Sequence, residues 1–134
     1  MDLACRIAAV ERATRGTVCF HDYSGRLEAL VGSARIQHRT PFCVRQKAQT
    51  SGACTRCEAD FCQATATRLA EGFLKRCHAG VIEAYVPIRD ADGQTGAVFL
   101  GPWRWTGRAV PPEVQQDPQP ATRPARAPDP PSLD

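Results

Sequence analysis

Apolar residues recur at helical spacing near the N-terminal end of the chain. Leu3, Ile7 and Val10 lie three or four positions apart, and Gly16 follows as a natural stop. This pattern predicts a short amphipathic helix over residues 2–14 that packs against a sheet.

Strand-like and helix-like segments then alternate. Residues 17–21, which read TVCFH, are rich in β-branched and aromatic side chains and predict a strand. A turn signal at residues 22–25 follows, and residues 27–31 are then expected as a second strand or a loop. Pro41 can occupy the first position of a helix, so residues 42–49 predict a short helix.

A second helix is predicted from a capping-box pattern. Thr55 and Glu58 have the spacing at which a hydroxyl and a carboxylate satisfy the first free amides of a helix, which would run to about Ala70 and end at Gly72. Cys62 lies off its expected inward stripe, which consists of Cys57, Phe61, Ala64 and Leu69.

The last third of the chain predicts an antiparallel hairpin. Residues 80–89 alternate, with Ile82, Ala84, Val86 and Ile88 on one side and Glu83 and Tyr85 on the other. Asp92-Gly93 is a strong hairpin turn, and residues 95–100 form the returning strand. The element order predicts an α+β fold, a PAS-like antiparallel sheet with helices on one face enclosing a small cavity.

Composition divides the chain after Thr106. Residues 107–134 are crowded with proline and contain few apolar residues, so we expect a disordered tail after a domain of residues 1–106. A linker toward a further domain is the alternative for this tail.

Charge and chain start exclude some classes of function. The formal charge of +3 is spread without a basic run, which argues against direct nucleic-acid binding. The first residues lack the positive region of a signal peptide, and no apolar stretch reaches membrane length, so we expect a cytoplasmic protein. Thiols stay reduced there, and seven cysteines then favour metal or redox chemistry over disulfides.

The candidate chemistry lies in the middle of the chain. Expected metal ligands are the thiols and the imidazole of Cys43, Cys54, Cys57, Cys77 and His78. Cys54 and Cys57 form a CxxC pair, whose offset suits a tetrahedral metal, and Cys57 is expected in a first helical turn that favours its thiolate. Buried cysteines acting as small hydrophobic residues, or a redox pair, are the alternatives.

Other side chains are weaker candidates for catalysis or metal binding. Because Cys77 and His78 are adjacent, they point to opposite faces of a regular strand and do not form a nucleophile with its base. His21 and His38 are candidate nitrogen ligands, or form structural hydrogen bonds instead. We expect core positions for Cys5, Cys19, Trp103 and Trp105. No catalytic motif or paired carboxylates appear, so we do not expect an enzyme.

In its order of motifs the chain resembles the PocR sensory domain family. The motifs are CFHDYSGRL at 19–27, HRTPFC at 38–43, Arg56-Cys57 with Asp60, CHAGV at 77–81, Pro87-Ile88 and Leu100-Gly101-Pro102. The resemblance implies a PAS-like fold whose cavity senses small hydrocarbon derivatives, such as the short diol to which the founding regulator responds. It also implies that cysteines matching Cys43, Cys57 and Cys77, with His78, are suspected metal ligands. We expect zinc as the metal in preference to an iron–sulfur cluster.

The resemblance leads to two main hypotheses. In the first, a small organic ligand binds a pocket that includes His21, His38, Phe42, Glu83 and Tyr85, and the signal passes to a DNA-binding or kinase output domain or protein in trans, with the domain acting alone or as a homodimer. In the second, the same cysteines make a redox or iron–sulfur sensor. A thiol-dependent enzyme is a third and weaker hypothesis.

Overall fold

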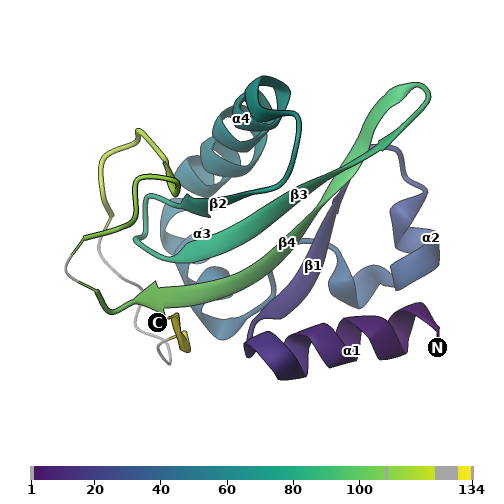
Figure 1. The fold of residues 1–134 in the computed structure, drawn as a ribbon, viewed down its shortest axis with the longest axis horizontal. Helices are drawn as coiled ribbons and strands as arrows, with labels where there is room; N and C mark the ends of the chain where they lie inside the picture. Colours follow the sequence, from purple (N-terminus) through teal and green to yellow (C-terminus); the bar gives the residue numbers. More distant parts are fainter. Residues whose placement is uncertain (1, 108, 123–129, 134) are drawn as a thin grey trace.

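A mostly antiparallel sheet forms the centre of the protein (Figure 1). The computed structural model describes residues 2–107, 109–122 and 130–133. Its sheet has the strand order β1-β4-β3-β2-β5, and β6 pairs with β4 off this path. The strands are β1 (Thr17–Asp22), β2 (Phe73–Arg76), β3 (Ile82–Asp90), β4 (Gly93–Trp105), β5 (Gln115–Gln116) and β6 (Ser132–Leu133). The predicted α+β fold class is confirmed.

The β3–β4 hairpin is the longest pairing in the sheet, and it confirms the hairpin predicted from alternation. Its turn lies at Ala91-Asp92, one residue before the predicted Asp92-Gly93, because Gly93 already pairs with Asp90. Gly93 has φ +121°, a conformation that residues with a Cβ rarely adopt. Strand β4 extends well beyond the predicted residues 95–100. Residues 96–101 of β4 pair with β1 along the other edge, where Cys19 lies opposite Phe99.

Side chains alternate between the two faces of this sheet. Cys19, Tyr85, Ala97 and Phe99 belong to one buried cluster with helix residues Cys57, Cys62 and Ala66. Val18 and Phe20 lie on the opposite face, where they cluster with Ile7 of the first helix. Figure 1 shows α3 and α4 on one side of the strands and α1 and α2 on the other. The sheet thus separates two apolar layers, and the expectation of helices on one face only is wrong, because both faces of the sheet carry apolar side chains that helices cover.

Helix α1 (Leu3–Thr14) confirms the first predicted helix. Asp2 caps it by accepting a hydrogen bond from the Cys5 amide. Cys5 itself is exposed, so its predicted core position is wrong, since only Ile7 of this helix turns fully into the sheet. Gly16 matters for packing, because a Cβ there would lie 2.8 Å from Cζ2 of Trp103.

Residues Leu27–Val31 form a helix, α2, and the expected strand or loop there is wrong. The Asp22 carboxylate accepts hydrogen bonds from the amides of Ser24, Gly25 and Glu28, and this local turn directs the chain into a helix. A short turn, η1 (Ser33–Arg35), follows before the chain reaches the sheet face that carries the candidate site.

One long helical segment covers that face. It consists of α3 (Pro41–Thr55), the π-helical turn η2 (Arg56–Phe61) and α4 (Cys62–Leu69). Thr40 caps its start through the Cys43 amide. The capping box predicted at Thr55 does not form, because Thr55 has helical angles and its side chain makes no capping hydrogen bond.

The π turn also changes which side chains point inward. Hydrogen bonds between residues five apart bring Cys57 and Cys62 to the same face, and both are buried. Ala64 is exposed, so the predicted stripe of Cys57, Phe61, Ala64 and Leu69 is wrong from the turn onward. The helix ends at Ala70 in a left-handed conformation and not at Gly72.

The segment after Thr106 packs against the body in its described part. Strand β5 pairs with β2, and Val114 and Asp117 are buried. The expected domain boundary after Thr106 therefore falls inside this packed unit, while residues 123–129 of the predicted tail lie outside the described residues. Among the described helices, none is both long and apolar enough to cross a membrane.

Candidate functional site

A cavity lies where the α3–η2 segment covers strands β2 and β3. Its volume is about 30 Å³, enough for one or two waters or for an ion. The lining, called here the buried cavity, consists of His38, Phe42, Cys43, Gln46, Lys47, Cys54, Cys57, Glu58, Lys75, Cys77, His78, Ala79, Val81 and Glu83. Distant parts of the chain thus meet at one small space.

All the expected metal ligands contribute to this cavity. Cys43, Cys54 and Cys57 come from the long helical segment, and Cys77 and His78 come from the turn between β2 and β3. That turn is closed by a hydrogen bond from the Gly80 amide to the Cys77 carbonyl. Cys77 and His78 are therefore not in a regular strand, and both reach the cavity.

The sulfur atoms do not form a compact ligand set. Among the described residues, the group of three metal-ligating side chains whose donor atoms all lie within 4.8 Å contains no cysteine. His78 instead has Nδ1 at 3.1 Å from the Thr122 hydroxyl. These residues do not fit a single tetrahedral ion as they are arranged, and the cysteine metal site stays a prediction.

The environment of the thiols keeps them protonated. Burial raises the pKa of Cys43 to about 12 and also raises the pKa values of Cys54 and Cys77. The pKa of Cys57 is raised by a hydrogen bond with Cys62 and by burial. The first-turn position expected for Cys57 is wrong, because Cys57 lies in the η2 turn, which continues directly from α3 and has no free amides to favour a thiolate.

A row of buried polar groups crosses the cavity floor. Lys75 Nζ lies 2.8 Å from Glu83 Oε1 and 3.7 Å from the Cys57 sulfur. The other Glu83 oxygen lies 2.6 Å from Nε2 of His38. Burial alone would raise the pKa of Glu83, but His38 and Lys75 outweigh it and hold the pKa below its ordinary value. Glu83 is thus a buried carboxylate between cationic neighbours.

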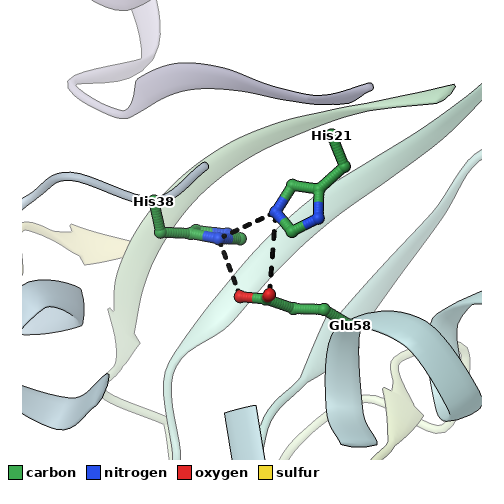
Figure 2. A group of neighbouring side chains, drawn as sticks. All are labelled: His21, His38 and Glu58. Atoms are coloured by element: carbon green, nitrogen blue, oxygen red, sulfur yellow. Dashed lines mark hydrogen bonds and ion pairs between the residues drawn. The ribbon is translucent and has the colours of Figure 1, made fainter. Parts of the chain in front are cut away.

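Three side chains converge at the edge of the cavity, as Figure 2 shows. Nε2 of His21 lies 3.4 Å from Nδ1 of His38, and Glu58 reaches both rings, at 3.7 Å from His21 and 2.9 Å from His38. Burial lowers the pKa of His21 to about 4, so this ring is neutral at pH 7. Burial would raise the pKa of Glu58, but the two histidines and Lys47 hold it at about 2.

This cluster borders a second, more open space. This space, called here the surface hollow, has a volume of about 330 Å³. It is lined by His21, Tyr23, Gln37, Lys47, Ser51, Cys54, Thr55, Glu58, Ala59 and Gln63. Lys47, Cys54 and Glu58 line both spaces. The hollow is large enough for a small organic molecule, and most of the residues that line it have side chains with polar groups.

The expected pocket residues are divided by the structure. His38, Phe42 and Glu83 line the buried cavity, and His21 lines the surface hollow. Tyr85 lines neither space, because its ring stacks on Phe73 in the core and its hydroxyl accepts a hydrogen bond from Gln94.

Sequence reasoning missed Lys47, Glu58 and Lys75 as site residues. Glu58 was assigned to a capping box, which concealed its role. Lys75 lies directly opposite Glu83 in the β2–β3 ladder. The correct pairing of these two strands would have identified it as a partner of Glu83. A lone lysine in a short apolar run gives no other signal.

The fold and the two adjoining spaces define an α+β domain with a polar site between its sheet and one helical layer. A family model described as "Sensory domain found in PocR" matches residues 7–120. The chain belongs to this family. Neither the curated proteins nor the solved structures gave a match.

Proposed function

We propose that this chain is the ligand-binding sensory domain of a cytoplasmic bacterial signalling protein and that it detects a small polar organic molecule. The observation that carries the proposal is the surface hollow, which shares the lining residues Lys47, Cys54 and Glu58 with a cavity that holds buried charged groups. A pocket with a few convergent polar groups is typical of small-molecule sites. The family match supports a sensory role.

The chemistry of the hollow favours a ligand with hydrogen-bonding groups. Lys47 supplies a cation, Gln63 and Ser51 supply neutral donors and acceptors, and Glu58 supplies an anion. A short diol or hydroxy acid matches this mixture, whereas a plain hydrocarbon makes no hydrogen bond with any of these groups.

Signalling follows from the position of the site. The hollow joins the α3–η2 segment to His21 on β1, so a ligand that contacts both stabilises one arrangement of helix against sheet. An output domain or protein, of the DNA-binding or kinase type, would detect that arrangement in cis or in trans.

A thermal-shift screen with short alcohols, diols, hydroxy acids and sugars tests this proposal. A true ligand raises the melting temperature, and the increase grows with the logarithm of the ligand concentration above the dissociation constant. Lys47→Met should weaken the response, whereas Arg12→Met, which removes the same charge from α1 on the opposite face of the sheet, should leave it unchanged. A screen without any stabilising compound would count against the proposal.

One observation favours a redox or iron–sulfur sensor as the second candidate: Cys43, Cys54, Cys57 and Cys77 all line one cavity. The raised pKa values of these thiols oppose direct oxidation, because thiolates are the reactive form. Visible absorption after anaerobic purification separates the candidates, since a cluster colours the protein brown.

A further inference from the structure

Three side chains from separate elements aim their donor atoms at one point (Figure 2). His21 comes from β1, His38 from the loop before α3, and Glu58 from η2. Their donor atoms all lie within 4.8 Å of one another. One nitrogen of each histidine ring and the Glu58 carboxylate thus surround a common space.

The spacing matches that of metal ligands. Two nitrogens bound to one tetrahedral zinc ion at 2.0–2.1 Å are about 3.4 Å apart, and Nε2 of His21 and Nδ1 of His38 are 3.4 Å apart. Glu58 Oε2 lies 3.7 Å from Nε2 of His21, and Glu58 Oε1 lies 2.9 Å from Nδ1 of His38. Metal binding displaces the proton between His38 Nδ1 and Glu58 to solvent, and small side-chain rotations then place all three donors around one ion.

His38 is also oriented from behind. Its second nitrogen, Nε2, lies 2.6 Å from Glu83 Oε2, and Lys75 holds the other Glu83 oxygen at 2.8 Å. His38 and Glu83 are both buried. A carboxylate on the far nitrogen is the arrangement that fixes the ring of a metal-bound histidine and strengthens it as a ligand.

The cluster has an open side. His21 and Glu58 line the surface hollow, so a fourth coordination position would face a space of about 330 Å³. Lys47 Nζ lies 3.3 Å from Glu58 Oε1, and its ammonium would have to move aside when a divalent cation binds this carboxylate. Three protein ligands with an exchangeable position are typical of sites where a metal meets a small molecule.

We propose that His21, His38 and Glu58 bind a divalent transition metal ion, such as zinc, with one coordination position open to the surface hollow. Glu83 acts as the positioning residue behind His38. This site is separate from the cysteine site expected from the sequence, and it does not depend on which organic ligand the domain detects. Two imidazoles with one carboxylate suit zinc, iron(II) or cobalt(II).

Titration of the purified 134-residue chain with Co(II) alone, followed by visible absorption, and with Zn(II) by calorimetry, tests the proposal. We expect one ion per chain and a cobalt spectrum without a thiolate charge-transfer band. His21→Gln and Glu58→Gln are suitable variants because both positions are only partly buried. Glu83→Gln should weaken binding about 10–100-fold, and each ligand variant should weaken it more.

Matched controls distinguish this site from the cysteine site. His78→Gln makes the same substitution at the remaining histidine, which lines the buried cavity but lies outside the cluster. This variant should leave the affinity for Co(II) and Zn(II) unchanged, and so should Cys54→Ser. Circular dichroism of every variant checks that the fold is retained.

Absence of binding, unchanged affinity in folded His21→Gln and Glu58→Gln, or loss of binding in Cys54→Ser or His78→Gln would each overturn the proposal. The thermal-shift screen for organic ligands, run in the presence of a chelator, is scored separately. A failed metal site and a failed sensory role are therefore distinguishable.

Discussion

Lys75 and Glu83 lie directly opposite each other on neighbouring strands β2 and β3, with Nζ of the lysine 2.8 Å from Oε1 of the glutamate. Their side chains are only 1% and 4% exposed. The ladder therefore holds a charge pair beneath the helical layer. Without Glu83, the Lys75 ammonium would be buried with no carboxylate partner, and without Lys75, the Glu83 carboxylate would keep only His38.

Removal of one partner of this pair should be severely destabilising. Lys75→Met leaves the Glu83 carboxylate without its ammonium, and such broken buried pairs cost about 3–5 kcal/mol of unfolding free energy. The double variant Lys75→Met, Glu83→Met should lose less than Lys75→Met alone, because it buries no unpaired charge. Urea unfolding curves of the variants measure this. A double variant that loses the sum of both single effects would contradict the explanation.

The close approach of β4 to β1 at Gly96 should not tolerate a side chain. A Cβ at this position would collide with the carbonyl oxygen of His21 and with Leu27. Gly96→Ala should therefore lower the unfolding free energy by about 1–3 kcal/mol, the usual cost of overpacking.

Gly52 provides the opposite case for comparison. It lies in α3, and a Cβ there would meet only the flexible end of Arg56, at 3.3 Å. Gly52→Ala should stabilise the protein by about 0.5–1 kcal/mol, since alanine loses less backbone entropy in a helix. Thermal unfolding of both variants checks the predicted signs, and equal effects would refute the steric argument for Gly96.

The segment after Thr106 should contribute to stability. A chain ending at Thr106 loses β5, the buried Val114 and the amide of Asp117, which donates to the Arg76 carbonyl. Burial of one valine and two or three hydrogen bonds together amount to about 3 kcal/mol.

A chain ending at Thr122 serves as the control, because it keeps these contacts and loses the short pairing of β6 with β4. Chemical denaturation of the two truncated chains compares them directly. Equal stability of both chains would show that the packed segment contributes nothing.

The pairing of Glu11 with Arg35 should make stability depend on pH. Arg35 donates hydrogen bonds to both carboxylate oxygens, and they lower the pKa of Glu11 below its ordinary value. A depressed folded pKa means that the stabilisation is complete above the unfolded pKa and is lost as the pH falls through the folded pKa.

Glu11→Gln should therefore cost about 1 kcal/mol at pH 7, because the pair is partly exposed. The difference from the unsubstituted chain should shrink below about pH 4. Urea unfolding at both pH values measures it, with the exposed Glu71→Gln as control. A difference that stayed constant with pH would exclude this carboxylate as the cause.

Prediction from the sequence succeeded where structure is local. The α1 helix, β1 and the β3–β4 hairpin follow from the periodicity of nearby residues and from turn residues such as Asp92-Gly93. The errors at Leu27–Val31 and Thr55 have a common origin: patterns of a few residues were interpreted without the hydrogen bonds that compete with them.

The candidate site was predicted in part for the same reason. The sequence indicated that Cys43, Cys57 and Cys77 belong to one site, and all three line the buried cavity. It did not indicate that their sulfurs stay apart while His21, His38 and Glu58 meet. The positions of those donors depend on strand register and on the π turn, which no short pattern encodes.

By itself, the sequence determined the fold class, the main hairpin and the family, because alternation, turn chemistry and ordered motifs are properties of neighbouring residues. Only the tertiary structure decided which titratable groups share a space. Lys75 meets Glu83 through the β2–β3 ladder, and Glu58 reaches the histidines through the η2 turn. Such distances are set by packing of the whole chain, so they are absent from any local stretch of it.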